Sequence, residues 1–140
     1  MNHRTTLGAL ALSLALLTGP ALAHHSFAMF DMKARTGLSG TVKQLDWTNP
    51  HITLWVYRDA KPGEAAELWN FESSSPGNMT RDGWTKRTLQ PGDKVQIEYF
   101  PERGAIHSGE LAKVIMSATG KVYDLYAAPG QSAVTPTAPR

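Results

Sequence analysis

The chain has 140 residues, with 14 Lys and Arg against 12 Asp and Glu, and it contains no cysteine. This near balance of charge argues against a nucleic-acid partner, which would require a strongly basic surface. The lack of cysteine excludes disulfides and thiolate metal sites, so metal ligands would have to be His, Met, Asp or Glu.

The N-terminal segment reads as an export signal. A short basic start precedes an apolar run at 7–17, and Ala21-Leu22-Ala23 supplies the small residues of a cleavage site. The run is too short for a permanent membrane helix, so we expect no membrane span after cleavage and a periplasmic or secreted protein. An uncleaved anchor is the alternative. The predicted divisions are a signal peptide at 1–23, one domain at 24–126 and a disordered tail at 127–140.

Alternating apolar residues predict six strands after the signal. The first runs from Leu38 to Trp47 and changes phase near Lys43-Gln44, which indicates a β-bulge. The second runs from His51 to Tyr57, with one apolar face and one face of His, Thr, Trp and Tyr. The other four strands are expected at 67–72, 94–100, 110–117 and 121–126.

A short helix is predicted between the third and fourth strands. Ser75 is a suitable N-cap, Pro76 suits the first helical position, and Gly83 suits the stop. Three strands, a short helix and further strands are the order of an OB-like barrel. The predicted fold is therefore all-β with one short helix, a small OB-like antiparallel β-barrel; another small barrel or an open antiparallel sheet is the alternative. The ligand-binding loops of such barrels would here hold His51 and His107.

Several short motifs occur once each along the mature chain: A-H-H-S-F, W-T-N-P-H, S-P-G-N, R-D-G-W-T and L-Q-P-G-D-K-V. In combination they resemble a family of small exported bacterial proteins of unknown function, over nearly the whole mature chain to about Tyr126. The resemblance implies a secreted β-rich domain. It implies no established activity and no catalytic residues.

Cleavage after Ala23 would make His24 the first residue of the mature chain. Its α-amine and imidazole, with a second imidazole from elsewhere, would form a histidine brace, and such a nitrogen set favours copper. His51 is the leading second ligand, His107 is a further candidate, and His25 offers a variant with the amine and a deprotonated amide. Sulfur ligands for Cu(I) could come from Met29, Met32, Met79 and Met116, although methionine more often fills a core.

A hairpin would bring part of this site together. If residues 25–31 fold back on 38–47, His24 lies opposite Asp46. Asp46 could then accept a hydrogen bond from a metal-bound imidazole and fix its tautomer.

A metal-free binding module is the competing interpretation. Trp47, Asn49, Trp55 and Tyr57 would then hold a small molecule, a glycan or a protein partner. A structural envelope component is a third possibility. No nucleophile motif surrounds the serines, so an enzyme is not favoured, although oxidative copper chemistry stays open. We therefore expect an exported barrel that carries or senses copper.

Overall fold

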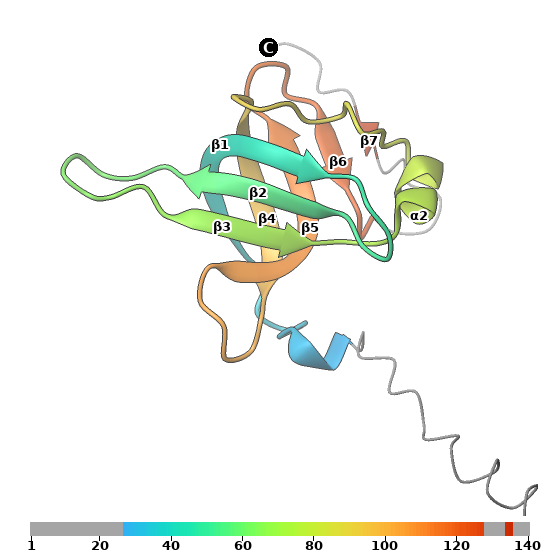
Figure 1. Cartoon of the computed structure of the whole chain (residues 1–140), viewed down its shortest axis with the longest axis horizontal. Helices are drawn as coiled ribbons and strands as arrows, with labels where there is room; N and C mark the ends of the chain where they lie inside the picture. The colour runs from blue at the N-terminus through green and yellow to red at the C-terminus, as the bar shows by residue number, and fades with distance from the viewer. Residues whose placement is uncertain (1–26, 128–133, 136–140) are drawn as a thin grey trace, which may run out of the picture.

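The computed structural model describes residues 27–127 and 134–135. Within them, five strands form a closed barrel with one short α-helix, which confirms the predicted fold class (Figure 1). The strands lie in the order β3-β2-β1-β4-β5, and a parallel pairing of β3 with β5 closes the ring. Their bounds are β1 (Thr36–Asp46), β2 (Thr53–Arg58), β3 (Leu68–Glu72), β4 (Lys94–Pro101) and β5 (Ser108–Met116).

Strand β1 serves two parts of the barrel. Its first half pairs with β4 and its second half with β2, and Gly40 pairs with both Val95 and Arg58. The register of β1 against β2 shifts between Val42 and Gln44, where the sequence predicted a β-bulge. The bulge bends the strand, so that one strand can turn the sheet back on itself.

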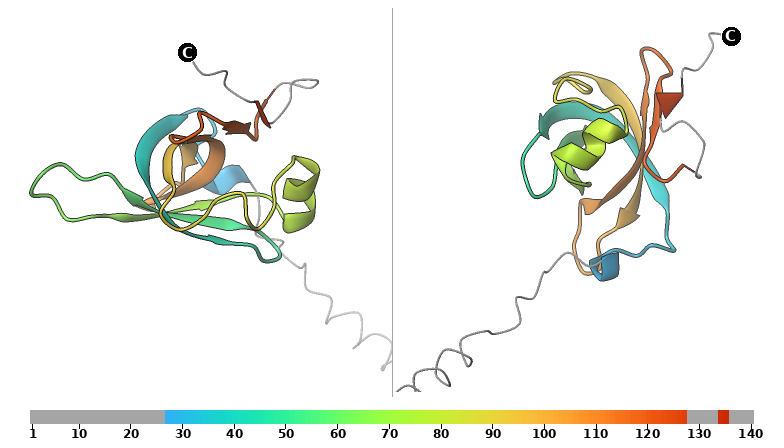
Figure 2. Two further views of the ribbon diagram at one scale, coloured as in Figure 1. Left: turned by 90° about the horizontal axis from the view of Figure 1, so that it is seen from above. Right: turned by 90° about the vertical axis from the view of Figure 1, so that its right-hand side faces the viewer.

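The core lies inside the barrel. Ile52, Leu54 and Val56, the apolar face predicted for the second strand, are all fully buried. Helix α2 (Pro76–Arg81) lies at one end of the barrel (Figure 2). Its predicted N-cap is confirmed, because the Ser75 Oγ accepts a hydrogen bond from the Asn78 backbone nitrogen over 3.4 Å. Met79 of this helix is buried in the same core.

The segment before β1 does not form the predicted hairpin. It contains a 3-10 helix, η1 (Phe27–Met29), and Phe30 then bridges to Glu102 after β4. The hairpin was wrong because Phe30 packs against Phe100 and Ala112 instead. Residues 36–41 of β1 also pair with β4 on one edge, and residues 40–46 pair with β2 on the other. The argument that set His24 opposite Asp46 therefore no longer holds.

Two short strands follow the barrel. Strand β6 (Val122–Asp124) pairs with β5, and β7 (Val134–Thr135) pairs with β6. A disordered tail was predicted at 127–140, and residues 128–133 and 136–140 lie outside the described residues. The backbone at 134–135 adds to the edge left open by β6. The helices of the described ranges are too short and too polar to cross a membrane.

Candidate functional site

A cavity of about 230 Å³ lies where the end of β3 meets the segment before β1. One side of its wall comes from η1 and the residue that follows it. The rest comes from the β1–β2 loop, the end of β3 with the loop after it, and β5. The lining residues are Phe27, Met29, Phe30, His51, Glu72, Ser73, Ser74 and Glu110. The cavity thus combines an apolar rim with an imidazole and two carboxyl groups.

His51 is held in this wall by the backbone beside it. The Ile52 nitrogen donates to the Ser74 carbonyl and the Ser73 nitrogen donates to the Ile52 carbonyl, both over 3.1 Å. This ladder brings the ring of His51 against Glu72, and Nδ1 of His51 hydrogen-bonds Oε1 of Glu72. A neutral imidazole whose Nδ1 donates to a carboxylate carries its lone pair on Nε2, and this is the tautomer of many metal-ligating histidines.

Glu110 lies next to Glu72 in the parallel pairing of β3 with β5. Burial raises the pKa of Glu110 to about 7, although a hydrogen bond from the Tyr126 hydroxyl acts to lower it. That hydroxyl lies 3.2 Å from Oε1 of Glu110. The carboxyl can therefore change its charge near neutral pH, and a cation in the cavity would favour its ionised form.

The cavity is also close in sequence to Ala23, after which the sequence predicts cleavage. His24 and His25 lie outside the described residues, but Phe27 lines the cavity. Three residues of extended chain span at most about 11 Å, so the chain is long enough for His24 to reach the cavity from Phe27.

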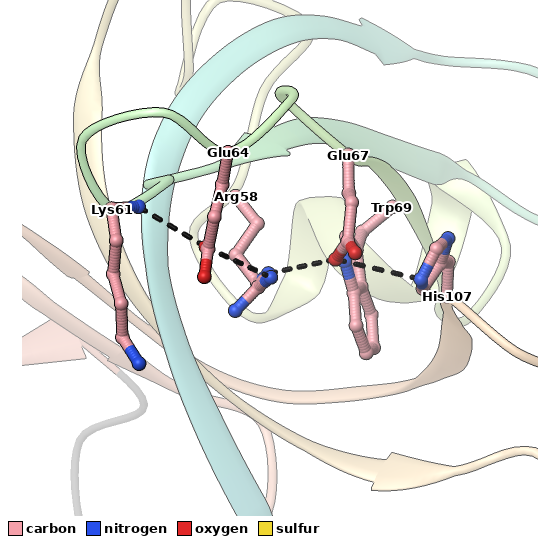
Figure 3. Close-up of polar contacts among 6 residues, drawn as sticks. All are labelled: Arg58, Lys61, Glu64, Glu67, Trp69 and His107. Atoms are coloured by element: carbon pink, nitrogen blue, oxygen red, sulfur yellow. Dashed lines mark hydrogen bonds and ion pairs between the residues drawn. The ribbon is translucent and has the colours of Figure 1, made fainter.

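His107 lies in a different cluster (Figure 3). Its Nε2 lies 3.4 Å from Oε2 of Glu67, and its ring centroid lies 4.9 Å from that of Trp69. The same oxygen of Glu67 accepts a hydrogen bond from the Arg58 Nε over 2.8 Å. This bond is the main cause that lowers the pKa of Glu67, with smaller contributions from Trp69 and His107.

The structure does not bring His51 and His107 together. Their carboxylate partners, Glu72 and Glu67, are five residues apart on an extended segment, which corresponds to about 17 Å. An odd offset also directs the two glutamates to opposite faces of the strand. One metal ion therefore cannot take both imidazoles. Among residues 27–127, no group of three or more His, Asp or Glu side chains is arranged to hold a metal ion.

The predicted aromatic face of β2 does not line the cavity. Trp55 donates its indole proton to Asp46 over 2.8 Å, and Lys43 lies 5.9 Å from the centroid of the Trp55 ring. Tyr57 is 41% exposed on the same side of β2. Trp47 packs against the barrel core and Asn49 is exposed in the β1–β2 loop. Asp46 is thus the partner of a tryptophan in this structure.

Sequence reasoning missed the two glutamates of the cavity. It assigned no role to Glu72 or Glu110. The parallel pairing that sets Glu110 beside Glu72 joins segments 38 residues apart and leaves no local pattern in the sequence. The nearest signal in the sequence was the alternation from His51 to Tyr57. It predicted which side chains lie on each face of β2, but not which residues of other strands lie beside them.

The comparisons with known proteins add one finding. No curated protein and no solved structure matches the chain significantly. The model of a family of unknown function, DUF6152, matches residues 11–111, a span that includes β1 to β4 and both glutamates of the cavity. Because the match extends over more than half of the chain, the protein belongs to the DUF6152 family of unknown function.

Proposed function

We propose that this chain is an exported β-barrel protein that binds copper at the cavity beside His51, as a carrier or sensor of the metal. The ligands would be the α-amine and imidazole of His24, created by cleavage after Ala23, together with Nε2 of His51. The observation that carries the proposal is the His51–Glu72 hydrogen bond in the wall of a cavity that Phe27 also lines.

The donor set fits the metal. Amine and imidazole nitrogens suit Cu(II), and copper has the highest affinity in the divalent series. Glu72 would orient His51 and increase the basicity of its Nε2, as carboxylate partners of metal-bound histidines do. The carboxyls of Glu72 and Glu110 would also offset the charge of a divalent cation within the cavity.

The test is a Cu(II) titration of mature protein whose first residue, His24, is verified by mass. We expect one ion per chain in the wild type. His51→Ala should weaken binding by more than the roughly 10- to 100-fold loss that follows removal of an outer-shell partner. His107→Ala is the matched control, because His107 lies beside Glu67, away from the cavity. This variant should bind copper as the wild type does.

A second pair of proteins tests the role of cleavage. One extra residue before His24 removes the terminal amine from the predicted ligand set, so binding should collapse in the extended protein. Equal copper affinities of the mature and the extended protein would contradict the proposal. Equal losses of copper affinity in His51→Ala and His107→Ala would contradict it as well. Trp55→Ala should leave copper affinity unchanged, since Trp55 is bonded to Asp46 and does not line the cavity.

A further inference from the structure

We infer that Met29 supplies a thioether ligand through which the same cavity also holds Cu(I). This inference rests on the proposed function, because it uses the same ion site and adds one ligand and one oxidation state to it. The sequence offered four methionines for this role, and the structure distinguishes between them.

The backbone at Met29 is held on both sides. The Arg103 nitrogen donates to the Met29 carbonyl over 2.8 Å. The next residue, Phe30, is 6% exposed and bridges to Glu102. These contacts tie η1 to the β4–β5 loop. Met29 lines the cavity together with His51.

The other candidate methionines are used for packing. Met79 is 1% exposed, and its sulfur accepts a hydrogen bond from the Ser73 hydroxyl. Met32 packs against the cluster of Phe30, Phe100 and Ala112, and Met116 packs against the barrel core. Met29, in contrast, is 39% exposed. Methionine is usually among the buried residues, so an exposed methionine that lines the same cavity as an imidazole is not explained by core filling.

The chemistry of the two oxidation states follows from the donors. Thioether sulfur is a soft ligand that selects Cu(I), whereas amine and imidazole nitrogens suit Cu(II). The chain contains no cysteine, so methionine is its only source of sulfur. A cavity lined by both Met29 and His51 can therefore retain copper in either state. The inference concerns binding alone and includes no electron transfer.

The experiment compares the affinities for both ions in one set of mature proteins. Cu(I) is titrated without oxygen against a chromophoric Cu(I) chelator, and Cu(II) is titrated in air. The variant is Met29→Leu, which keeps the volume and apolar character of the side chain and is readily tolerated. Met32→Leu is the matched control, three residues away and packed in the small apolar cluster.

We expect Met29→Leu to lower the Cu(I) affinity by about tenfold or more, with the Cu(II) affinity nearly unchanged. Met32→Leu should change neither affinity. The methyl resonance of Met29 should also shift when diamagnetic Cu(I) is added to the wild type. An unchanged Cu(I) affinity in Met29→Leu overturns the inference, and the proposed function survives if His51→Ala still loses Cu(II). Failure of the wild type to bind either ion overturns both.

Discussion

Glu110 is the residue whose environment departs most from that of a surface carboxylate. It is directly paired with Glu72 across the barrel closure, and its carboxyl accepts from the hydroxyl of Tyr126. The ring of Tyr126 in turn packs edge-on against Phe100, with centroids 5.1 Å apart. Burial is the first cause that raises the pKa of Tyr126, and the neighbouring Glu110 adds to it. Two acidic groups thus share one partly buried contact, in which the Tyr126 hydroxyl donates to the Glu110 carboxyl.

The burial of Glu110 makes folding stability depend on pH. Below the ordinary pKa of 4.5 the Glu110 carboxyl is protonated in both states, and above about 7 it is ionised in both. Between these values the folded chain keeps a proton that the unfolded chain has lost, so the free energy of unfolding falls as the pH rises. The shift from 4.5 to about 7 corresponds to at most about 3–4 kcal/mol, at roughly 1.4 kcal/mol per unit.

We therefore expect Glu110→Gln to lose this part of the pH dependence. Urea denaturation between pH 4.5 and 8, with a chelator present, measures the free energy of unfolding of each protein. Relative to wild type, the variant should become more stable as the pH rises. Glu64→Gln, a change to an exposed carboxylate of the β2–β3 loop, is the control. Parallel pH profiles for wild type and Glu110→Gln would contradict the argument.

Strand β5 is closely packed between two neighbouring strands where the barrel closes. Its first residues pair with β3 in parallel and with β4 in antiparallel orientation, so that Gly109 lies between Phe71 and Pro101. A Cβ at Gly109 would lie 2.6 Å from the Phe100 carbonyl oxygen and 2.6 Å from the ring of Tyr99. A side chain at this position would therefore strain the closure of the barrel.

Gly109→Ala should therefore lower the free energy of unfolding by about 1–3 kcal/mol, the usual cost of overpacking. The measurement is the urea midpoint of the variant against wild type. Gly77→Ala is the control, since nothing lies within 4 Å of a Cβ there, and alanine in a helix is favoured by up to about 1 kcal/mol. A Gly109→Ala protein as stable as wild type would mean that the β3–β5 closure can relax.

Local patterns in the sequence predicted these elements more successfully than their contacts. The alternation of Ile52, Leu54 and Val56, the bulge after Val42 and the Ser75 cap all depend on neighbouring residues, and all are confirmed. The path of η1 depends instead on the distant Glu102 and Phe100, so the hairpin prediction was wrong. For the same reason the sequence could predict only part of the candidate site, because the partner of His51 lies 21 residues away on β3.

At the scale of the whole molecule, the closure of the barrel gathers the cavity from four separate parts of the chain. The β1–β2 loop brings His51, β3 brings Glu72, β5 brings Glu110, and η1 brings Met29. The unfolded chain cannot hold these groups together, so a metal ion bound at the cavity must favour the folded state. This coupling matters in a chain that has no disulfide to limit its unfolded ensemble.

Copper should therefore stabilise the mature protein against heat. Free copper at 100 times its dissociation constant would add about 2.7 kcal/mol to the free energy of unfolding, and the gain would grow with the logarithm of the copper concentration. Calorimetric scans of the mature chain with and without Cu(II) measure the gain. His51→Ala and the protein with one extra residue before His24 should gain much less at the same concentration, whereas His107→Ala should gain as much as wild type. Equal gains in all four proteins would mean that copper binds the folded chain away from the cavity, because neither His51 nor the terminal amine would then contribute to the stabilisation.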